Sequence, residues 1–180
     1  MNLKTLYTRW AWTTLAGVAV FAVLAFVDLR LKADSGFGTL ALQKVSTAAG
    51  IRAIWAAWIP ERDALMAGFN LGFDYLFMPL YGFAFYYGTL AARHAFVRGT
   101  GTMFRLMTVL AAIPLAGALC DAAENALETY MVVVQPTDRL AEIAYAATTA
   151  KLVCFYVGFF MSLIGVIGLF IRRRKVEAEA

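Results

Sequence analysis

Long apolar stretches alternate with short polar segments along this chain. Four of the stretches approach or exceed the roughly 20 residues that a helix needs to cross a ~30 Å hydrocarbon core. They run over about 10–27, 64–92, 104–134 and 143–171. The first is longer than the apolar region of a usual signal peptide, and no small-residue cleavage site follows it, so we expect it to be retained. The pattern predicts an all-α integral membrane bundle of four transmembrane helices, forming a single domain over 1–180.

A shorter amphipathic segment lies between the first two stretches. Over about 46–59, apolar residues recur at the spacing of one helix face, while Arg52 lies off that face and Pro60 is expected to end the helix. The apolar positions are Ile51, Ile54, Trp55, Trp58 and Ile59. The preceding residues 28–38 carry mixed charges and two glycines, and we expect an exit loop there. The helix is predicted to be extracytoplasmic, either lying flat in the headgroup region or covering the mouth of the bundle.

Composition and charge place the protein in a membrane. Of its 180 residues 62% are apolar, and the mean hydropathy is +0.69, which excludes an ordinary soluble domain. The net charge is +4, and basic residues cluster at the ends of the predicted spans. They are Lys4, Arg9, Arg93, His94, Arg98, Arg105, Arg172, Arg173, Arg174 and Lys175. The positive-inside rule then predicts that both termini and the 93–105 link are cytoplasmic, with 28–63 and 135–142 outside. Membrane lipids, and not a nucleic acid, are the partners that such a charge pattern favours.

Polar side chains form a stripe inside the third apolar stretch. Asp121, Glu124, Asn125 and Glu128 follow the spacing i, i+3, i+4 and i+7, so they share one helix face. A carboxylate that faces hydrocarbon costs on the order of 2.5 kcal/mol or more, so this face is expected to meet other helices, water or a cation. For Glu128 a second interpretation stays open, in which it lies near the outer interface and solvates the end of the helix.

Depth estimates bring polar residues of three helices together. Asp74 lies about ten residues into the second span, near the midplane, and Lys151 of the fourth span is expected at a similar depth. Asp121 lies in the outer half of the third span. We therefore expect the candidate ligand-binding residues to meet in the outer half of the bundle. They are Asp74, Tyr75, Asp121, Glu124, Asn125 and Lys151.

Several chemistries lack the residues that they require. The single histidine, His94, cannot form a bis-histidine haem site, and no serine lies in a GxSxG context. Cys120 and Cys154 form no CxxC motif and are expected to be free thiols, with a disulfide as the alternative. Oxygen ligands of the acidic stripe suit a hard divalent cation, but Lys151 argues against one, so no metal site is predicted and no cofactor is assigned.

The acidic cluster leaves several functions open. The preferred hypothesis is the binding of a small amphiphilic or cationic ligand at an acidic intramembrane site. The alternative is a structural or accessory subunit, with a membrane-protein partner or a second copy, in which buried ion pairs only fix the helices. A lipid-modifying enzyme and a proton or ion pathway come third, so whether the protein is an enzyme stays undecided. For packing, Gly68 and Gly72 in GxxxG spacing, and Gly158, Gly165 and Gly168, are expected to let helices approach closely.

Two short motifs carry a resemblance to known sequences. GFDYLFMPLYG in the second span and CDAAENAL in the third resemble the FDY and DxxEN motifs of a group of small, uncharacterised bacterial four-helix membrane proteins. The resemblance extends over most of the chain, including LALQKVSTAAGIRAIWAAW before the second span. It implies a four-helix membrane fold and a bacterial inner membrane. The group has no assigned activity, so no functional residue is carried over.

Overall fold

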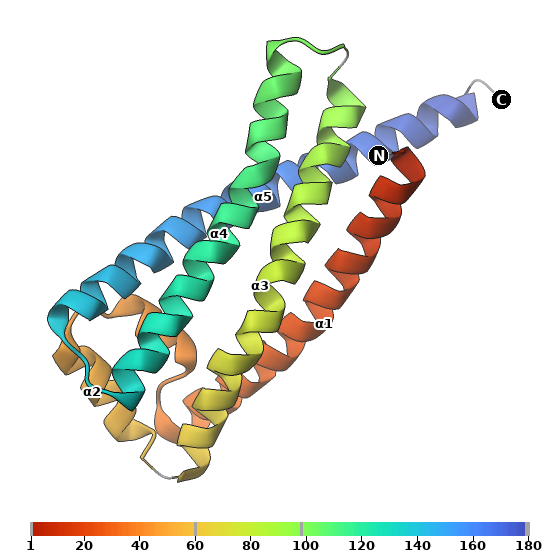
Figure 1. The fold of residues 1–180 in the computed structure, drawn as a ribbon. Helices are drawn as coiled ribbons and strands as arrows, with labels where there is room; N and C mark the ends of the chain where they lie inside the picture. Colours follow the sequence, from red (N-terminus) through yellow and green to blue (C-terminus); the bar gives the residue numbers. More distant parts are fainter. Residues whose placement is uncertain (1, 60, 98, 179–180) are drawn as a thin grey trace. The chain divides into compact units, whose positions relative to one another are not determined.

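The computed structural model describes residues 2–59, 61–97 and 99–178, and the side chains of these residues except Glu61 and 172–178. Within this part every regular element is helical, which confirms the all-α class there (Figure 1). The elements are α1 (Leu3–Ser35), η1 (Thr39–Lys44), α2 (Ala48–Ala57), α3 (Glu61–Phe96), α4 (Thr102–Val133) and α5 (Asp138–Ala178). Pro60, Arg98 and the side chains of Arg172, Arg173, Arg174 and Lys175, all used in the sequence predictions, lie outside the described residues.

Three helices are long and apolar enough to cross a membrane. They cover Leu3–Ser35, Thr102–Val133 and Asp138–Ile171. Each also leaves large apolar side chains exposed, among them Phe26 of α1 and Phe170 of α5, as suits a surface that faces lipid. The fourth expected span, 64–92, lies within α3, which is 36 residues long but does not belong to this group. Length and composition alone therefore establish three candidate spans.

Three of the long helices, α1, α3 and α5, extend beyond the apolar stretches that predicted them. The expected exit loop at 28–38 is wrong, because α1 continues through the charged residues to Ser35. Gly36 then adopts a φ of 85°, and its N–H donates to the carbonyl of Lys32 at 2.9 Å, which is a common way for a helix to end. At the start of α5, the Thr137 hydroxyl accepts from the N–H of Leu140 at 3.3 Å. In α1, charged residues therefore end the apolar part without ending the helix.

The chain divides into two compact units that share the long helices. The first comprises Met1–Gly17, Pro79–Ala118 and Leu152–Ala180, and the second comprises Val18–Met78 and Leu119–Lys151. In the first unit, small residues allow α3 and α5 to lie close together. A Cβ on Gly165 would lie 2.6 Å from the carbonyl oxygen of Gly88, and one on Gly168 would lie 2.4 Å from the Cβ of Ala95. The predicted close approach at Gly158, Gly165 and Gly168 is confirmed.

The second unit has its apolar core around α2. The core comprises Leu31, Leu42, Ile51, Ile54, Trp58, Ala67, Leu71, Met131, Ala141 and Ala144. Trp58 is fully buried and donates from Nε1 to the carbonyl of Phe37 at 2.7 Å. Arg52 lies off the apolar face, as predicted, and donates to the carbonyl of Pro136 at 3.2 Å. The amphipathic helix is thus confirmed, over 48–57, but its apolar face packs against the protein and Ile59 beyond its end is 73% exposed.

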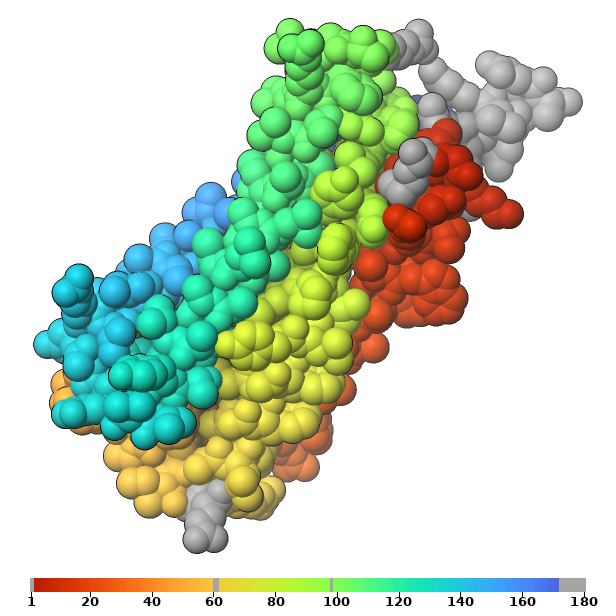
Figure 2. All heavy atoms as spheres, viewed as in Figure 1, coloured from red at the N-terminus to blue at the C-terminus, as the bar shows by residue number. Residues whose placement is uncertain are grey.

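The glycines at the start of α3 do not bring helices together. A Cβ on Gly68 or Gly72 would meet no heavy atom within 4 Å among the described residues. The expectation that this GxxxG pair packs against another helix of the chain is therefore wrong. These two glycines line an open groove along the boundary of α3 and α4 in this unit, which Figure 2 shows in yellow and teal.

Candidate functional site: a buried acidic cluster

The polar stripe of α4 lies on one buried helix face, as its spacing predicts. Asp121, Glu124, Asn125 and Glu128 are each at most 5% exposed. Glu128 is 2% exposed, so the second interpretation, in which its side chain faces water at the end of the helix, is wrong. All four residues belong to the second unit, together with Asp74 and Tyr75 of α3 and Lys151 of α5. The sequence-predicted residues therefore come together within one compact part of the fold.

One ammonium group joins α5 to two carboxylates of α4. Lys151 Nζ lies 2.8 Å from Asp121 Oδ1 and 2.8 Å from Glu124 Oε2. All three side chains are buried, so these contacts are scarcely screened by water. Such a group is costly to take out of water, and it is tolerated because each charge meets its opposite at hydrogen-bonding distance.

An amide links the same face of α4 to α3. Asn125 Nδ2 donates to Asp74 Oδ2 at 2.9 Å and to the carbonyl of Leu71 at 3.2 Å. One turn away along α4, the carbonyl of Ala122 accepts from the Tyr75 hydroxyl at 3.2 Å. Tyr75 is 43% exposed, so it stands at the edge of the cluster and not inside it. Together these bonds fix the register of α3 against α4 in this unit.

Acceptor capacity exceeds the supply of donors in the cluster. Glu124 Oε1 is buried and has no hydrogen-bond partner among the described residues. For Glu128 the described part of the chain supplies neither a hydrogen bond nor an ion pair, although this side chain lies in the electrostatic field of Glu124 and Lys151. Nearby, the buried hydroxyl of Thr148 donates to the carbonyl of Ala144 at 3.1 Å. Three buried carboxyl groups and the half-buried Asp74 therefore face a single ammonium group.

Metal binding is not the chemistry that this geometry favours. Among the described residues no group of three or more His, Cys, Asp or Glu side chains is arranged to hold a metal ion. Lys151 occupies the position between Asp121 and Glu124 where a cation would otherwise be held. Cys120 and Cys154 are both thiols and are not joined in a disulfide, as expected. The cluster is thus suited to a ligand that brings N–H donors and positive charge, or to the movement of a proton between carboxyl groups.

An apolar groove is lined by residues of α2, α3 and α4 in the second unit. It has a volume of about 740 Å³. Its lining comprises Trp55, Ala64, Gly68, Leu71, Gly72, Tyr75, Ala126, Thr129, Tyr130, Val132, Val133 and Val134. Leu71 and Tyr75 belong both to this lining and to the hydrogen bonds with α4. Trp55 Nε1, at the groove, is buried and without an acceptor in the described structure.

A second polar network was not anticipated from the sequence. Asp28 Oδ1 accepts from the Thr39 hydroxyl at 2.7 Å, and Thr39 Oγ1 in turn accepts from Asn70 Nδ2 at 2.7 Å. Asp138 also accepts from the backbone N–H of Ala48 at 2.8 Å, which caps α2 from a distant part of the chain. The one sequence signal that these hydrogen bonds share is a polar residue near the end of an apolar stretch. Such a residue does not identify its partner.

Comparison with known proteins gives no further assignment: no family model, no curated protein and no solved structure matches this chain.

Proposed function

We propose that this chain is a four-span membrane protein that binds a small amphiphilic amine at its buried acidic cluster. One observation carries the proposal: among the described residues Glu124 Oε1 is buried without a hydrogen-bond partner, and Glu128, which is 2% exposed, forms no ion pair, while Lys151 is the ammonium group beside them. An uncompensated buried carboxylate is strongly unfavourable, so these groups either bind a proton or accept from an added cation. A protonated amine supplies both the charge and up to three N–H donors.

The apolar part of the ligand is assigned to the groove beside the cluster. A volume of about 740 Å³ lies within the range of ordinary small-molecule sites. The open space over Gly68 and Gly72 admits a hydrocarbon chain or ring without displacing a side chain. Tyr75 lines the groove and donates to the carbonyl of Ala122 on α4. We assign to a rotation of its exposed ring the movement that links the groove to the acids.

The fourth span and the orientation are part of the same proposal. Two polar residues of α3 have partners inside the protein, since Asn70 donates to Thr39 and Asp74 accepts from Asn125. Because Asn70 Nδ2 and Asp74 Oδ2 are paired inside the protein, α3 is suited to cross the membrane as a fourth span. The positions of the arginines favour cytoplasmic termini and an extracytoplasmic α2. The FDY and DxxEN motifs favour the bacterial inner membrane.

Thermal unfolding of the full chain in lipid nanodiscs tests the amine site. Dodecylamine is the probe, and dodecanol, with the same chain and no charge, is its matched control. At a hundred times its Kd the amine is expected to stabilise the protein by about 2.7 kcal/mol, whereas the alcohol has little effect. Glu128→Gln removes the unpaired carboxylate at nearly constant volume and is expected to weaken amine binding tenfold or more.

The control variant is Glu142→Gln, which changes an exposed carboxylate of α5 and is expected to leave amine binding unchanged. Equal stabilisation by the amine and the alcohol would show that the acids do not recognise the head group, and the proposal would be wrong. If Glu128→Gln raises the unfolding temperature and no amine changes it, the cluster is a structural lock. In that case an accessory-subunit role gains support, and a stable hetero-complex should survive gentle extraction.

A further inference from the structure

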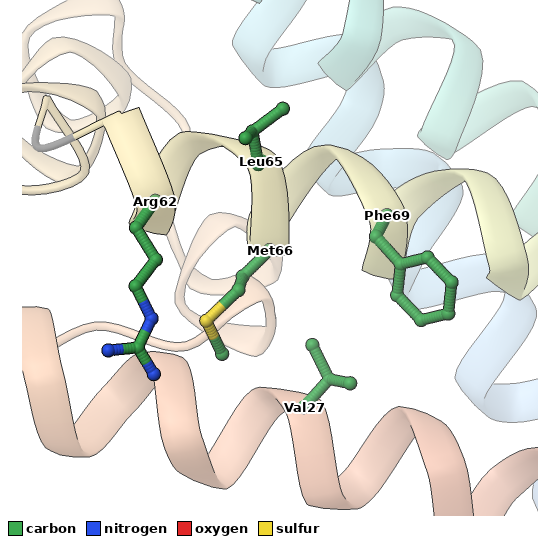
Figure 3. A pocket seen from close by; sticks show the side chains of 5 residues that line it. All are labelled: Val27, Arg62, Leu65, Met66 and Phe69. Atoms are coloured by element: carbon green, nitrogen blue, oxygen red, sulfur yellow. The ribbon is translucent and has the colours of Figure 1, made fainter.

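A second groove lies away from the acidic cluster, between α1 and α3 of the second unit. It has a volume of about 510 Å³ and is lined by Val27, Arg62, Leu65, Met66 and Phe69. In Figure 3, Val27 points from α1 toward α3, while Arg62, Met66 and Phe69 extend from α3 toward α1. Four of the five lining residues are apolar, and Arg62 is the charged one. The groove therefore combines a hydrocarbon floor with a cation at one end.

The charge at that end is part of a loose, exposed pair. Arg62 Nη2 lies 3.7 Å from Asp34 Oδ2, with the side chains 77% and 37% exposed. At this distance and exposure the two groups stabilise each other weakly, and both keep polar atoms available to another molecule. The pair consequently presents a positive and a negative group side by side at the mouth of an apolar groove.

Depth along the helices matches the layout of a phospholipid. Asp34 lies next to the end of α1, and Arg62 is the second residue of α3, so both charges stand at helix ends. Val27 lies seven residues before Asp34 on α1, and Phe69 lies seven residues after Arg62 on α3. Each separation is about 10 Å along the helix at 1.5 Å per residue. The first apolar stretch ends at Val27 and the second begins at Ala64. In a membrane, Asp34 and Arg62 therefore stand on the headgroup side of these residues, and Phe69 stands beside acyl chains.

We propose that this groove holds one acyl chain of a phosphoethanolamine lipid, with the phosphate on Arg62 and the primary ammonium on Asp34. A guanidinium group donates two N–H bonds to a phosphate in matching geometry. A primary ammonium donates to the Asp34 carboxylate, whereas a choline has no N–H to donate. A phosphoglycerol head group has no positive charge to place against Asp34. The paired charges thus select a zwitterionic head with a primary amine.

Native mass spectrometry of the full chain tests this selection. The protein is released from nanodiscs that contain phosphatidylethanolamine, phosphatidylcholine and phosphatidylglycerol in equal amounts with identical acyl chains. We expect the retained lipid to be enriched in phosphatidylethanolamine several-fold over its share of the bilayer. Asp34→Asn is expected to abolish this preference and to favour phosphatidylglycerol, because only the cation remains. Arg62→Gln is expected to reduce retention of all three lipids. Retained lipid in bulk proportions, or an unchanged preference in Asp34→Asn, would overturn the proposal.

Two matched controls separate a built site from ordinary lipid contact. Arg30→Gln removes an exposed arginine of α1, whose guanidinium lies over the ring of Phe26. This variant is expected to keep the preference for phosphatidylethanolamine. Val27→Trp fills the groove and is expected to release the lipid, whereas Val23→Trp, one turn earlier on α1 and outside the lining, is not. Equal effects of the two tryptophans would contradict the assigned groove. Glu128→Gln is expected to leave lipid retention unchanged, so the amine site and the lipid groove fail or succeed separately.

Discussion

Lys151 is the residue on which the acidic cluster depends. It is the ammonium that lies at 2.8 Å from both Asp121 and Glu124, and all three groups are buried. Lys151→Met keeps the length of the side chain but leaves two buried carboxylates without their cation. Removing one partner of a buried ion pair typically costs about 3–5 kcal/mol, and we expect a loss of that size in the free energy of unfolding. Unfolding in mixed micelles of increasing denaturing-detergent content measures it.

The exposed Lys44 gives the control for this prediction. Lys44→Met at the end of η1 is expected to change the unfolding free energy by no more than about 0.5 kcal/mol. Adding Asp121→Asn and Glu124→Gln to Lys151→Met should recover part of the lost stability, because the remaining groups are then neutral. If Lys151→Met unfolds like Lys44→Met, the ion pairs do not hold α4 and α5 together.

At the level of single residues, helical spacing predicted which side chains meet but not how they pair. The period of 3.6 residues is enough to place Asp121, Glu124, Asn125 and Glu128 on one face. It does not predict that Asn125 binds Asp74 and the carbonyl of Leu71. Pairing depends on the rotation of each helix about its axis and on side-chain torsion angles, and residue spacing determines neither. The Asp28–Thr39–Asn70 network was not predicted for the same reason, since Thr39 begins the six-residue element η1, which is too short to show a clear apolar period.

At the level of helices, two glycines of α3 and α5 have opposite environments and predict opposite outcomes. A Cβ on Gly165 would lie 2.6 Å from the carbonyl oxygen of Gly88, a backbone atom that cannot move without shifting its helix. Gly165→Ala is therefore expected to lower the free energy of unfolding by about 1–3 kcal/mol. A Cβ on Gly68 meets nothing within 4 Å, and Gly68→Ala is expected to be neutral or to gain up to about 1 kcal/mol from helix propensity.

Thermal unfolding of both variants in the same detergent measures the difference. Equal stability of the two alanine variants would contradict the close packing of α3 and α5 in the first unit. The sequence alone did not distinguish these positions, because a GxxxG spacing shows that a helix face permits close approach but not whether another helix packs against it.

The predicted end of the first helix was wrong for a related reason. Four of the eight residues 28–35 are charged, which ends burial in lipid, but most of the eight are good helix formers, so α1 continues to Ser35 and ends before Gly36.

For the whole molecule, the number of spans decides where the chain ends lie. Three candidate spans are established by length and composition, and α3 is the helix in question. With α3 as a fourth span the two termini share one side of the membrane, whereas with three spans they lie on opposite sides. Apolar length predicted the long helices well because it is a property of single segments. Whether a polar helix crosses depends on partners such as Thr39 and Asn125, which come from other segments.

Cysteine labelling in intact cells resolves the topology. In a background with Cys120 and Cys154 replaced by alanine, Thr100→Cys reports on the link between α3 and α4, and Lys44→Cys reports on the exposed end of η1. The arginines that flank the first link favour the cytoplasm. We therefore expect a membrane-impermeant maleimide to label Lys44→Cys and to reach Thr100→Cys only after the cells are opened. Labelling of both positions in intact cells would mean that α3 does not cross. The acidic cluster would then lie beside a helix that stays on one side of the membrane. Its ligand would be expected to reach it from water instead of from the bilayer.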